Sequence, residues 1–287
     1  ASILRKYRNF FTVSWKMFTF AVAKIRQIFS FMEYVRPKKH LGQHFLKDLR
    51  VAEAIADTVD AAPGLPILEV GPGMGVLTQF LARKGRELRV VEIDRESVAY
   101  LRENFNAFES EESIIGDDFL KMDLRETFGG RPFVLTGNYP YNISSQIFFK
   151  MLDYKEYIPC CTVMIQPEVA ERLAAKPGTK AFGILTVLVQ LWYDVEYLFT
   201  VPPGVFNPPP KVQSAVVRMT RNSTSDPGCD TALLTRIVKQ AFQQRRKMLR
   251  GSLRGLIPEN HEFSTKRPEQ LGVADFIRLT NDIASRL

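Results

Sequence analysis

The tetrapeptide Asn138-Tyr139-Pro140-Tyr141 carries the most specific chemical pattern in this sequence. The side-chain oxygen of Asn138 and the backbone carbonyl of Pro140 could accept both protons of an exocyclic amino group, while the Tyr141 ring stacks on the base. Adenine would need this help, because the lone pair of its amino nitrogen is delocalised into the ring. A plain turn containing asparagine and proline is the simpler alternative. The pattern therefore predicts transfer to a base amino group if a donor site lies beside it.

A glycine-rich turn provides a candidate donor site. Gly71, Gly73 and Gly75 follow the apolar run 67–70 and precede a helical pattern. Glycines let the backbone approach a ligand closely, and the first amides of a helix are unpaired donors. The spacing is GxGxG rather than the dinucleotide-binding GxGxxG, and no lysine–serine pair of a phosphate-binding loop follows. A turn that needs glycine for steric reasons alone stays open as the other interpretation.

Two acidic residues sharpen the prediction for this turn. Glu92 closes the next predicted strand, where a carboxylate can accept hydrogen bonds from both ribose hydroxyls. Asp117 closes the third strand, where it could accept a hydrogen bond from an adenine amino group. Either acid alone could be a solvated charge at a strand end. Together, an adenosine held by backbone amides and two carboxylates, without a phosphate ligand, suggests S-adenosylmethionine as the cofactor.

The predicted elements bring these residues to one edge of a sheet. Short apolar runs alternate with helical patterns, which is typical of an α/β fold with a parallel sheet. The carboxyl ends of parallel strands share one edge, so Gly71, Glu92, Asp117 and Asn138 are expected to converge there. Helices are predicted over 48–60 (with Asp48 as N-cap), 76–84, 95–106 and 167–175, and strands over 67–70, 88–94, 113–117, 133–138, 162–165, 189–199 and 212–219.

A short polar linker divides the chain. Residues 222–230 (NSTSDPGCD) contain glycine and proline, and the residues beyond them form helical patterns that Pro258 and Pro268 interrupt. We therefore predict one domain over 32–221 and a helical domain over 222–287.

Residues 1–31 form a basic leader with six basic residues and no acidic one. Their apolar residues recur at spacings of three and four, along one stripe of a helix. This pattern is typical of an organelle transit peptide or of a helix on a membrane surface. An extension upstream of an original start at Met32 is the third interpretation. The core protein is expected in the cytoplasm, or in an organelle if the leader is a transit peptide.

The net charge of +8 is unevenly distributed. Residues 32–221 are slightly acidic, whereas residues 222–287 hold 11 basic and 7 acidic residues. Contact with a polyanion is therefore expected of the C-terminal segment. The three cysteines lack metal-ligand spacing and only three histidines are present, so no metal site is predicted. No apolar run reaches the roughly 18 residues of a membrane-spanning helix, so no membrane partner is expected for the core protein.

From about residue 36 onward, the sequence resembles the ribosomal RNA adenine N6,N6-dimethyltransferases, specifically the bacterial small-subunit type. The resemblance implies a Rossmann-like class I S-adenosylmethionine-dependent methyltransferase sheet with a small all-helical C-terminal domain. It also implies a monomer that dimethylates two adjacent adenosines in a 3′-terminal hairpin of small-subunit (16S) ribosomal RNA, in the pre-30S particle. The matching segments are KKHLGQHFL, ILEVGPGMGVLT, VVEID, GDDFLKMD, GNYPYNIS, VPPGVFNPPPKVQSAVV and AFQQRRKMLRGSL.

The resemblance also implies roles for single residues. Its cofactor-binding residues correspond to Gln43, His44, Leu46, Gly71, Gly73, Glu92, Asp117 and Asn138. Phe206 should stack on the target adenine opposite Tyr141, which makes it the fourth predicted catalytic residue beside Asn138, Pro140 and Tyr141. The family usually has asparagine at the position of His44 and leucine at that of Tyr139. Backbone contacts could survive both changes.

The resemblance assigns the C-terminal basic residues to RNA. They lie in an acid-free stretch on predicted helices, which suits a phosphate backbone, although a solvated helix face usually explains such a run. Lys38 and Lys39 could add contacts at the mouth of the site. The predicted RNA contacts are Lys38, Lys39, Arg245, Arg246, Lys247 and Arg250, with Arg236, Lys239 and Arg254 nearby.

Two alternative functions stay open. A large-subunit rRNA dimethyltransferase of the macrolide-resistance type shares the cofactor and NxPY elements, but the segment AFQQRRKMLRGSL argues against it. A non-catalytic or mitochondrial nucleic-acid-binding homologue could keep the same scaffold. The intact Glu92, Asp117 and Asn138-Tyr139-Pro140-Tyr141 argue against a loss of catalysis.

Overall fold

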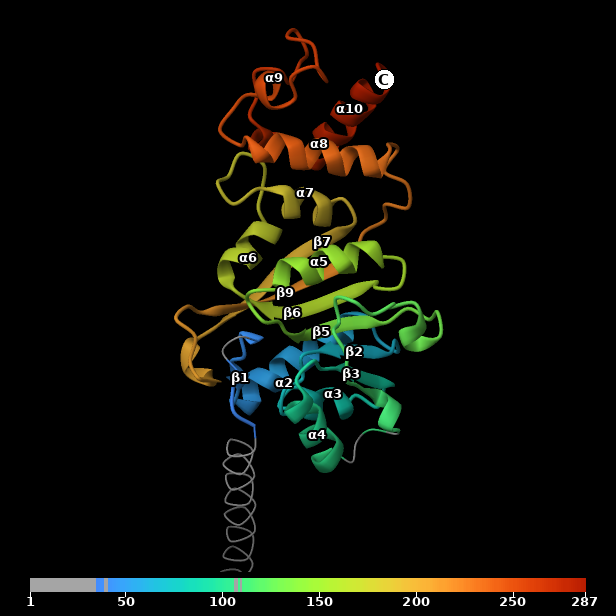
Figure 1. Cartoon of the computed structure of the whole chain (residues 1–287), viewed down its shortest axis with the longest axis vertical. Coiled ribbons are helices and arrows are strands. Elements are labelled where there is room, and N and C mark those ends of the chain that lie inside the picture. The colour runs from blue at the N-terminus through green and yellow to red at the C-terminus, as the bar shows by residue number, and fades with distance from the viewer. Residues whose placement is uncertain (1–34, 39–40, 106–107, 109) are drawn as a thin grey trace, which may run out of the picture.

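A computed structural model describes residues 35–38, 41–105, 108 and 110–287. Figure 1 shows an elongated molecule, with a sheet and its flanking helices below and the last helices stacked at the opposite end from α4. The leader predicted over 1–31 and the RNA contact predicted at Lys39 lie outside the described residues. Within the described ranges, no helix has both the length and the apolar character needed to cross a membrane.

Seven strands form one sheet in the order β4-β3-β2-β5-β6-β9-β7. The five strands from β4 to β6 are parallel, and β9 runs antiparallel between β6 and β7. The predicted α/β class is confirmed. Strand order reverses between β2 and β5, which is the switch point where such sheets bind ligands. The strands are β2 Ile67–Val70, β3 Leu88–Val91, β4 Ile114–Ile115, β5 Val134–Asn138, β6 Cys160–Ile165, β7 Tyr193–Val201 and β9 Ser214–Arg221.

Helices cover both faces of the sheet. Side chains alternate between faces along each strand, so Leu68 and Leu135 join one core cluster with α5 and α6. Ile67 and Val134 join the other cluster, with α2, α3 and α4. These elements are α2 Leu49–Asp57, η2 Thr58–Ala61, α3 Thr78–Ala82, α4 Arg95–Asn104, α5 Ser144–Asp153 and α6 Pro167–Leu173. The predicted N-cap is confirmed, because the Asp48 carboxylate accepts hydrogen bonds from the first amides of α2.

The strand predicted over 189–199 is wrong in its first part. Ile184–Gln190 forms helix α7, and strand β7 begins only at Tyr193. Residues 185–189 of this helix are all buried, since α7 packs against α5, α6 and α8. A short apolar run without a helical period has the same appearance in a buried helix and in a buried strand.

The C-terminal segment consists of helices, as predicted. These are α8 Thr231–Gln243, α9 Leu249–Ser252, η6 Pro268–Gln270 and α10 Val273–Ala284. Their apolar residues share one core cluster with α7, for example through Val187 and Leu234. The cluster therefore extends from the C-terminal helices into the segment before residue 222, and the domain boundary at 222–230 stays a prediction.

Candidate functional site

A cavity lies at the carboxyl ends of β2, β3 and β5, at the switch point of the sheet. Gly71 and Gly73 follow β2, Glu92 follows β3, and Asn138 ends β5. The convergence expected from the sequence therefore holds for these residues. The cavity is lined by Leu41, Gly42, Gln43, His44, Phe45, Gly71, Gly73, Glu92, Ile93, Asp118, Leu120, Asn138, Tyr139, Pro140, Tyr141, Asn142 and Ile143.

The turn after β2 requires glycine at Gly71 and Gly73. Both have positive φ angles, of 71° and 56°, a region that side chains with a Cβ occupy only with strain. A Cβ on Gly73 would lie 2.8 Å from Cε1 of Phe45. The amide of Gly71 donates to the carbonyl of Val91 at 2.9 Å, which ties the turn to β3. The bare backbone of this turn thus forms one wall of the cavity.

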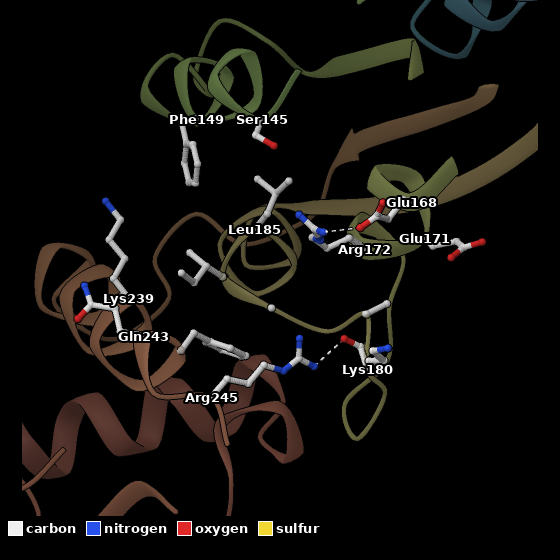
Figure 2. A pocket seen from close by; sticks show the side chains of 14 residues that line it. Ser145, Phe149, Glu168, Glu171, Arg172, Lys180, Leu185, Lys239, Gln243 and Arg245 are labelled. Atoms are coloured by element: carbon white, nitrogen blue, oxygen red, sulfur yellow. Dashed lines mark hydrogen bonds and ion pairs between the residues drawn. The ribbon is translucent and has the colours of Figure 1, made fainter. Parts of the chain in front are cut away.

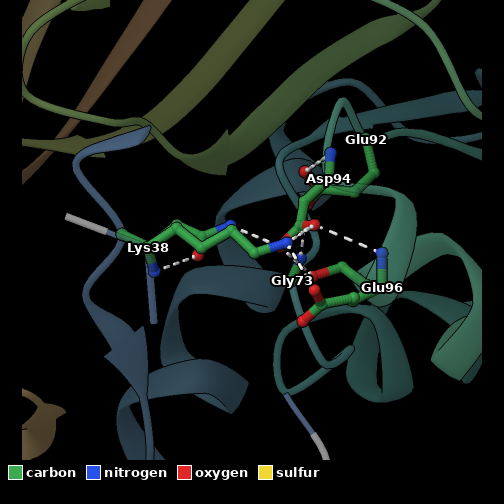
Figure 3. Close-up of polar contacts among 7 residues, drawn as sticks. Lys38, Gly73, Glu92, Asp94 and Glu96 are labelled. Carbon is green, nitrogen blue, oxygen red and sulfur yellow. Dashed lines mark hydrogen bonds and ion pairs between the residues drawn. The ribbon is translucent and has the colours of Figure 1, made fainter. Parts of the chain in front are cut away.

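Glu92 holds the turn from the neighbouring strand end. Its carboxylate accepts hydrogen bonds from the amide of Gly73 at 3.1 Å and from the amide of Asp94 at 2.9 Å. Figure 3 shows these contacts. Burial raises the pKa of Glu92, and the two amides act in the opposite direction. A carboxylate so placed can also accept hydrogen bonds from ligand hydroxyls in the cavity.

Lys38 is paired with two carboxylates of the protein. Its Nζ lies 2.5 Å from Oδ1 of Asp94 and 3.0 Å from Oε1 of Glu96 (Figure 3). Gln43 donates to the same Asp94 carboxylate at 3.2 Å and accepts from the amide of Lys38 at 2.8 Å. Asp94 is only 3% exposed, so it needs this cation. These contacts argue against the RNA contact predicted for Lys38. They tie the segment that carries Lys38 and Gln43 to Asp94.

The side chain of Asn138 is oriented by the segment that precedes β1 (Phe45–Leu46). Its Nδ2 donates to the backbone carbonyl of His44 at 3.1 Å, which leaves Oδ1 as the free acceptor of the amide. The Tyr141 ring stacks on the His44 ring with centroids 5.7 Å apart, and its hydroxyl lies 2.7 Å from Oγ of Ser214. His44 is itself fixed by a contact of 2.8 Å between Nδ1 and the carbonyl of Pro208. Tyr141 and His44 thus form a pair of stacked rings in the cavity lining, each fixed by a polar contact.

Tyr139 lies in the core. The family usually has leucine at this position. The residue is 1% exposed, and its ring packs at 6.0 Å from that of Phe148. Its hydroxyl finds a partner in Sγ of Cys161 at 3.8 Å. The extra polar group is therefore accommodated away from the neighbouring Asn138.

Asp117 does not line the cavity, although the next residue does. Asp117 is exposed, and its carboxylate accepts a hydrogen bond from the amide of Asp118 at 2.7 Å. Asp118, Ile93 and Asn142 line the cavity and were not predicted. Each follows a predicted site residue directly in the sequence. This adjacency is the only feature of the sequence that could have indicated their place in the site.

Leu46 and Phe206 lie in the core next to the cavity. They pair across a small antiparallel sheet of β1 and β8 (Phe206–Asn207) and are 6% and 1% exposed. Neither lines the cavity. Stacking of Phe206 on a base stays a prediction, and it would require the ring to leave its packing in the core.

A family model described as ribosomal RNA adenine dimethylase matches residues 35–283. The chain belongs to this family. It is 64% identical over 261 residues to the ribosomal RNA small subunit methyltransferase A of Phocaeicola vulgatus, covering 89% of this chain and 92% of that protein. The large-subunit alternative is not favoured, because relatives that are 58–64% identical bear this same small-subunit name.

Two solved structures of similar proteins share this fold. A dimethyladenosine transferase from Plasmodium falciparum superposes with a TM-score of 0.69 at 25% identity, over 85% of this chain and 98% of that one. The 23S rRNA methyltransferase ErmE superposes with a TM-score of 0.60 at 28% identity, over 84% of this chain and 99% of that one. Most of this chain's fold is thus shared with these two proteins.

In this family member, a groove lies between α5, α6, α7 and α8. Figure 2 shows it between α5 with Ser145 and Phe149, α6 with Arg172, and α8 with Lys239. The Nζ of Lys239 lies 5.8 Å from the centre of the Phe149 ring, which is 36% exposed. Ser145 of the groove lining lies two residues beyond Ile143 of the cavity lining.

The predicted basic run has two kinds of members. Arg245 is held by the protein, because it donates to the carbonyls of Thr179 and Lys180. Figure 2 shows the bond to Lys180. Arg246, Lys247 and Arg250 are exposed, and their side chains have no hydrogen-bond or ion-pair partner among the described residues. Residues 245–247 were predicted on a helix. They lie instead in the turn after α8, because α8 ends at Gln243. Within the described ranges, no group of three His, Cys, Asp or Glu residues could hold a metal ion.

Proposed function

We propose that this protein transfers methyl groups from S-adenosylmethionine to the N6 atoms of two adjacent adenosines in the 3′-terminal hairpin of small-subunit (16S) ribosomal RNA. The products would be N6,N6-dimethyladenosines. The observation that carries the proposal is the position of Asn138-Tyr139-Pro140-Tyr141 in the same cavity as Gly71, Gly73 and Glu92. An acceptor pair for an amino group thus lies beside a wall built for a nucleoside.

The cavity residues fit the cofactor by their chemistry. A side chain on Gly73 would displace the Phe45 ring, which also lines the cavity, so glycine at this position preserves the shape of the wall. The Glu92 carboxylate would accept ribose hydroxyls, and Ile93, which is 54% exposed, offers an apolar surface to a base. Gln43 and His44 border the opposite wall. When bound, S-adenosylmethionine would supply an electrophilic methyl group. Asp117 could keep its proposed contact to adenine through its second carboxylate oxygen, because only Oδ1 accepts the amide of Asp118.

The base-binding wall would prepare the amino nitrogen for attack. The free Oδ1 of Asn138 and the carbonyl of Pro140 would each accept one amino proton, which draws the lone pair out of conjugation with the ring. The stacked rings of Tyr141 and His44 would support the base after it leaves its helix. Each target adenine would need two cofactor molecules in succession, because it receives two methyl groups and each cofactor supplies one.

RNA would approach across the groove next to the cavity. The exposed Arg246, Lys247 and Arg250 would contact phosphates, and the Phe149 ring with Lys239 above it would offer a surface to a nucleotide. We further propose that the protein acts as a monomer on the pre-30S particle in the cytoplasm. The helical domain over 222–287 would supply the charged half of the RNA surface, and the domain over 32–221 would supply the chemistry.

Methyl transfer to under-methylated small subunits tests the proposal. Labelled S-adenosylmethionine should deliver methyl groups to adenosines of the small-subunit RNA, and digestion should yield N6,N6-dimethyladenosine. Large subunits serve as the matched control substrate. Cofactor binding without transfer to any RNA would favour the non-catalytic alternative, and transfer only to large subunits would favour the macrolide-resistance type.

A further inference from the structure

A row of polar side chains crosses the centre of the sheet below the glycine turn. Glu69 on β2, Thr136 on β5 and Thr162 on β6 are register partners in successive parallel strands. They share a face with Ile67 and Val134, since alternate residues of a strand point to the same side. The three side chains are 1%, 0% and 0% exposed. A carboxyl group therefore lies in the apolar layer between the sheet and α3.

The covering elements provide few partners for this row. Oγ1 of Thr78, on α3, donates to Oε2 of Glu69 at 2.6 Å. Thr58 gives its proton to the carbonyl of Ile55, so Thr162 must be the donor in its contact with Thr58. Oγ1 of Thr136 has no hydrogen-bond partner among the described residues. The Glu69 carboxyl thus has one firm hydrogen bond and, beside it in the row, a hydroxyl free to accept one.

The charges around Glu69 oppose its ionisation. The pKa of Glu69 is raised to about 8, because burial and the Glu92 carboxylate raise it by more than the hydrogen bond from Thr78 lowers it. Glu92 is the one charge among the described residues that acts on it, while α3 and β5 present only the hydroxyls of Thr78 and Thr136. Ionising both acids would place two like charges on either side of the turn that begins at Gly71.

We propose that Glu69 is a positioning residue that works as the neutral acid, tying β2 to α3 through Thr78 so that the turn from Gly71 to Gly75 keeps the shape of the cofactor wall. Ionised Glu69 would repel Glu92 and loosen that wall. The binding test of this inference rests on the proposed cofactor. The unfolding test does not, because the protonation of Glu69 is a property of the folded protein without ligand.

The ligand-free test compares thermal unfolding of the wild type and Glu69→Gln between pH 5 and pH 9. The amide stays neutral and can accept the same hydrogen bond from Thr78. A folded-state pKa above the unfolded value means that the stabilisation is present below about pH 4.5 and is lost as the pH rises to about 8. The melting temperature of the wild type should therefore fall with pH relative to that of Glu69→Gln. Glu53→Gln, on the exposed side of α2, should follow the wild type.

The binding test measures the dissociation constant of S-adenosylmethionine by calorimetry at pH 6.5 and pH 9. If only the neutral form of Glu69 allows cofactor binding, wild-type affinity should fall about tenfold between pH 6.5 and pH 9 relative to that of Glu69→Gln. Titration of the cofactor itself affects both proteins equally. Thr78→Val should weaken binding at pH 6.5, and Thr78→Ser, which keeps the hydroxyl, should restore it.

Parallel pH profiles of the wild type and Glu69→Gln in both measurements would overturn the inference, as would Glu69→Gln binding no cofactor at any pH. A wild type that binds no cofactor at all would instead contradict the proposed function. The unfolding profiles would then still show whether Glu69 is neutral in the folded protein.

Discussion

The side-chain amide of Asn138 donates to the backbone carbonyl of His44 at 3.1 Å. This bond joins the end of β5 to the segment before β1, 94 residues earlier in the chain. It also fixes which end of the amide is free, because the nitrogen is engaged and the oxygen is left to accept. The residue that would activate the amino group is therefore oriented by a backbone carbonyl and not by another side chain.

Asn138→Ala should retain RNA binding while losing methyl transfer. Removing one preorganised polar group from a reacting centre typically costs about 100- to 1000-fold in kcat. Single-turnover methylation measures the loss, and filter binding measures the RNA affinity. Asn260→Ala, at an exposed position, is the control. Methylation by Asn138→Ala at the wild-type rate would refute the role of the Asn138 oxygen.

Gly73→Ala and Gly85→Ala should separate backbone strain from loss of the cavity wall. Both glycines have positive φ, but a Cβ on Gly85 would meet nothing within 4 Å, whereas one on Gly73 would meet Phe45. Gly85→Ala should cost about 1 kcal/mol of unfolding free energy with unchanged cofactor affinity. Gly73→Ala should weaken cofactor binding at least about tenfold, which corresponds to about 1.4 kcal/mol. Equal cofactor affinities of the two variants would contradict the close approach at Gly73.

Lys38→Ala should lower stability near neutral pH, differ little from the wild type in strong acid, and leave RNA affinity unchanged. Burial would raise the pKa of Asp94, but hydrogen bonds from Lys38 and Gln43 outweigh this and lower it. A lowered pKa means that the stabilisation is present above about pH 4 and is lost as the pH falls below it. Without Lys38, the free energy of unfolding should fall near pH 7, and its difference from the wild type should shrink below about pH 4, as urea unfolding followed by circular dichroism would show. A variant with wild-type stability near pH 7 but weakened RNA binding would restore Lys38 as an RNA contact.

The double variant Arg246→Ala/Lys247→Ala should weaken RNA binding without affecting stability or cofactor binding. Each lost phosphate contact should reduce the slope of log affinity against log salt by about 0.7 to 0.9. Filter binding at several salt concentrations measures this slope. Arg102→Ala, on the exposed side of α4 at the other end of the molecule, is the control (Figure 1). An unchanged slope would remove these two residues from the RNA surface.

Local patterns determined most of the fold and the main walls of the site. The parallel sheet follows from short apolar runs separated by helices, and the meeting of Gly71, Glu92 and Asn138 follows from the common edge of parallel strands. Both relations depend only on the order of the strands and helices along the chain. This order can be read from the sequence. Helix α7 was misread because its residues are buried on every side, and burial by α5, α6 and α8 is a property of the tertiary structure.

Only the tertiary structure decided which polar groups are engaged. Lys38 and Arg245 have the same formal charge as Arg246, yet Lys38 pairs with Asp94 and Arg245 with carbonyls of 179–180. Likewise Phe206 is held in the core by its pairing with Leu46. A charged or aromatic residue type fixes what a side chain can do. Whether it is free to do it depends on partners far away in the chain, and the sequence does not state where they lie.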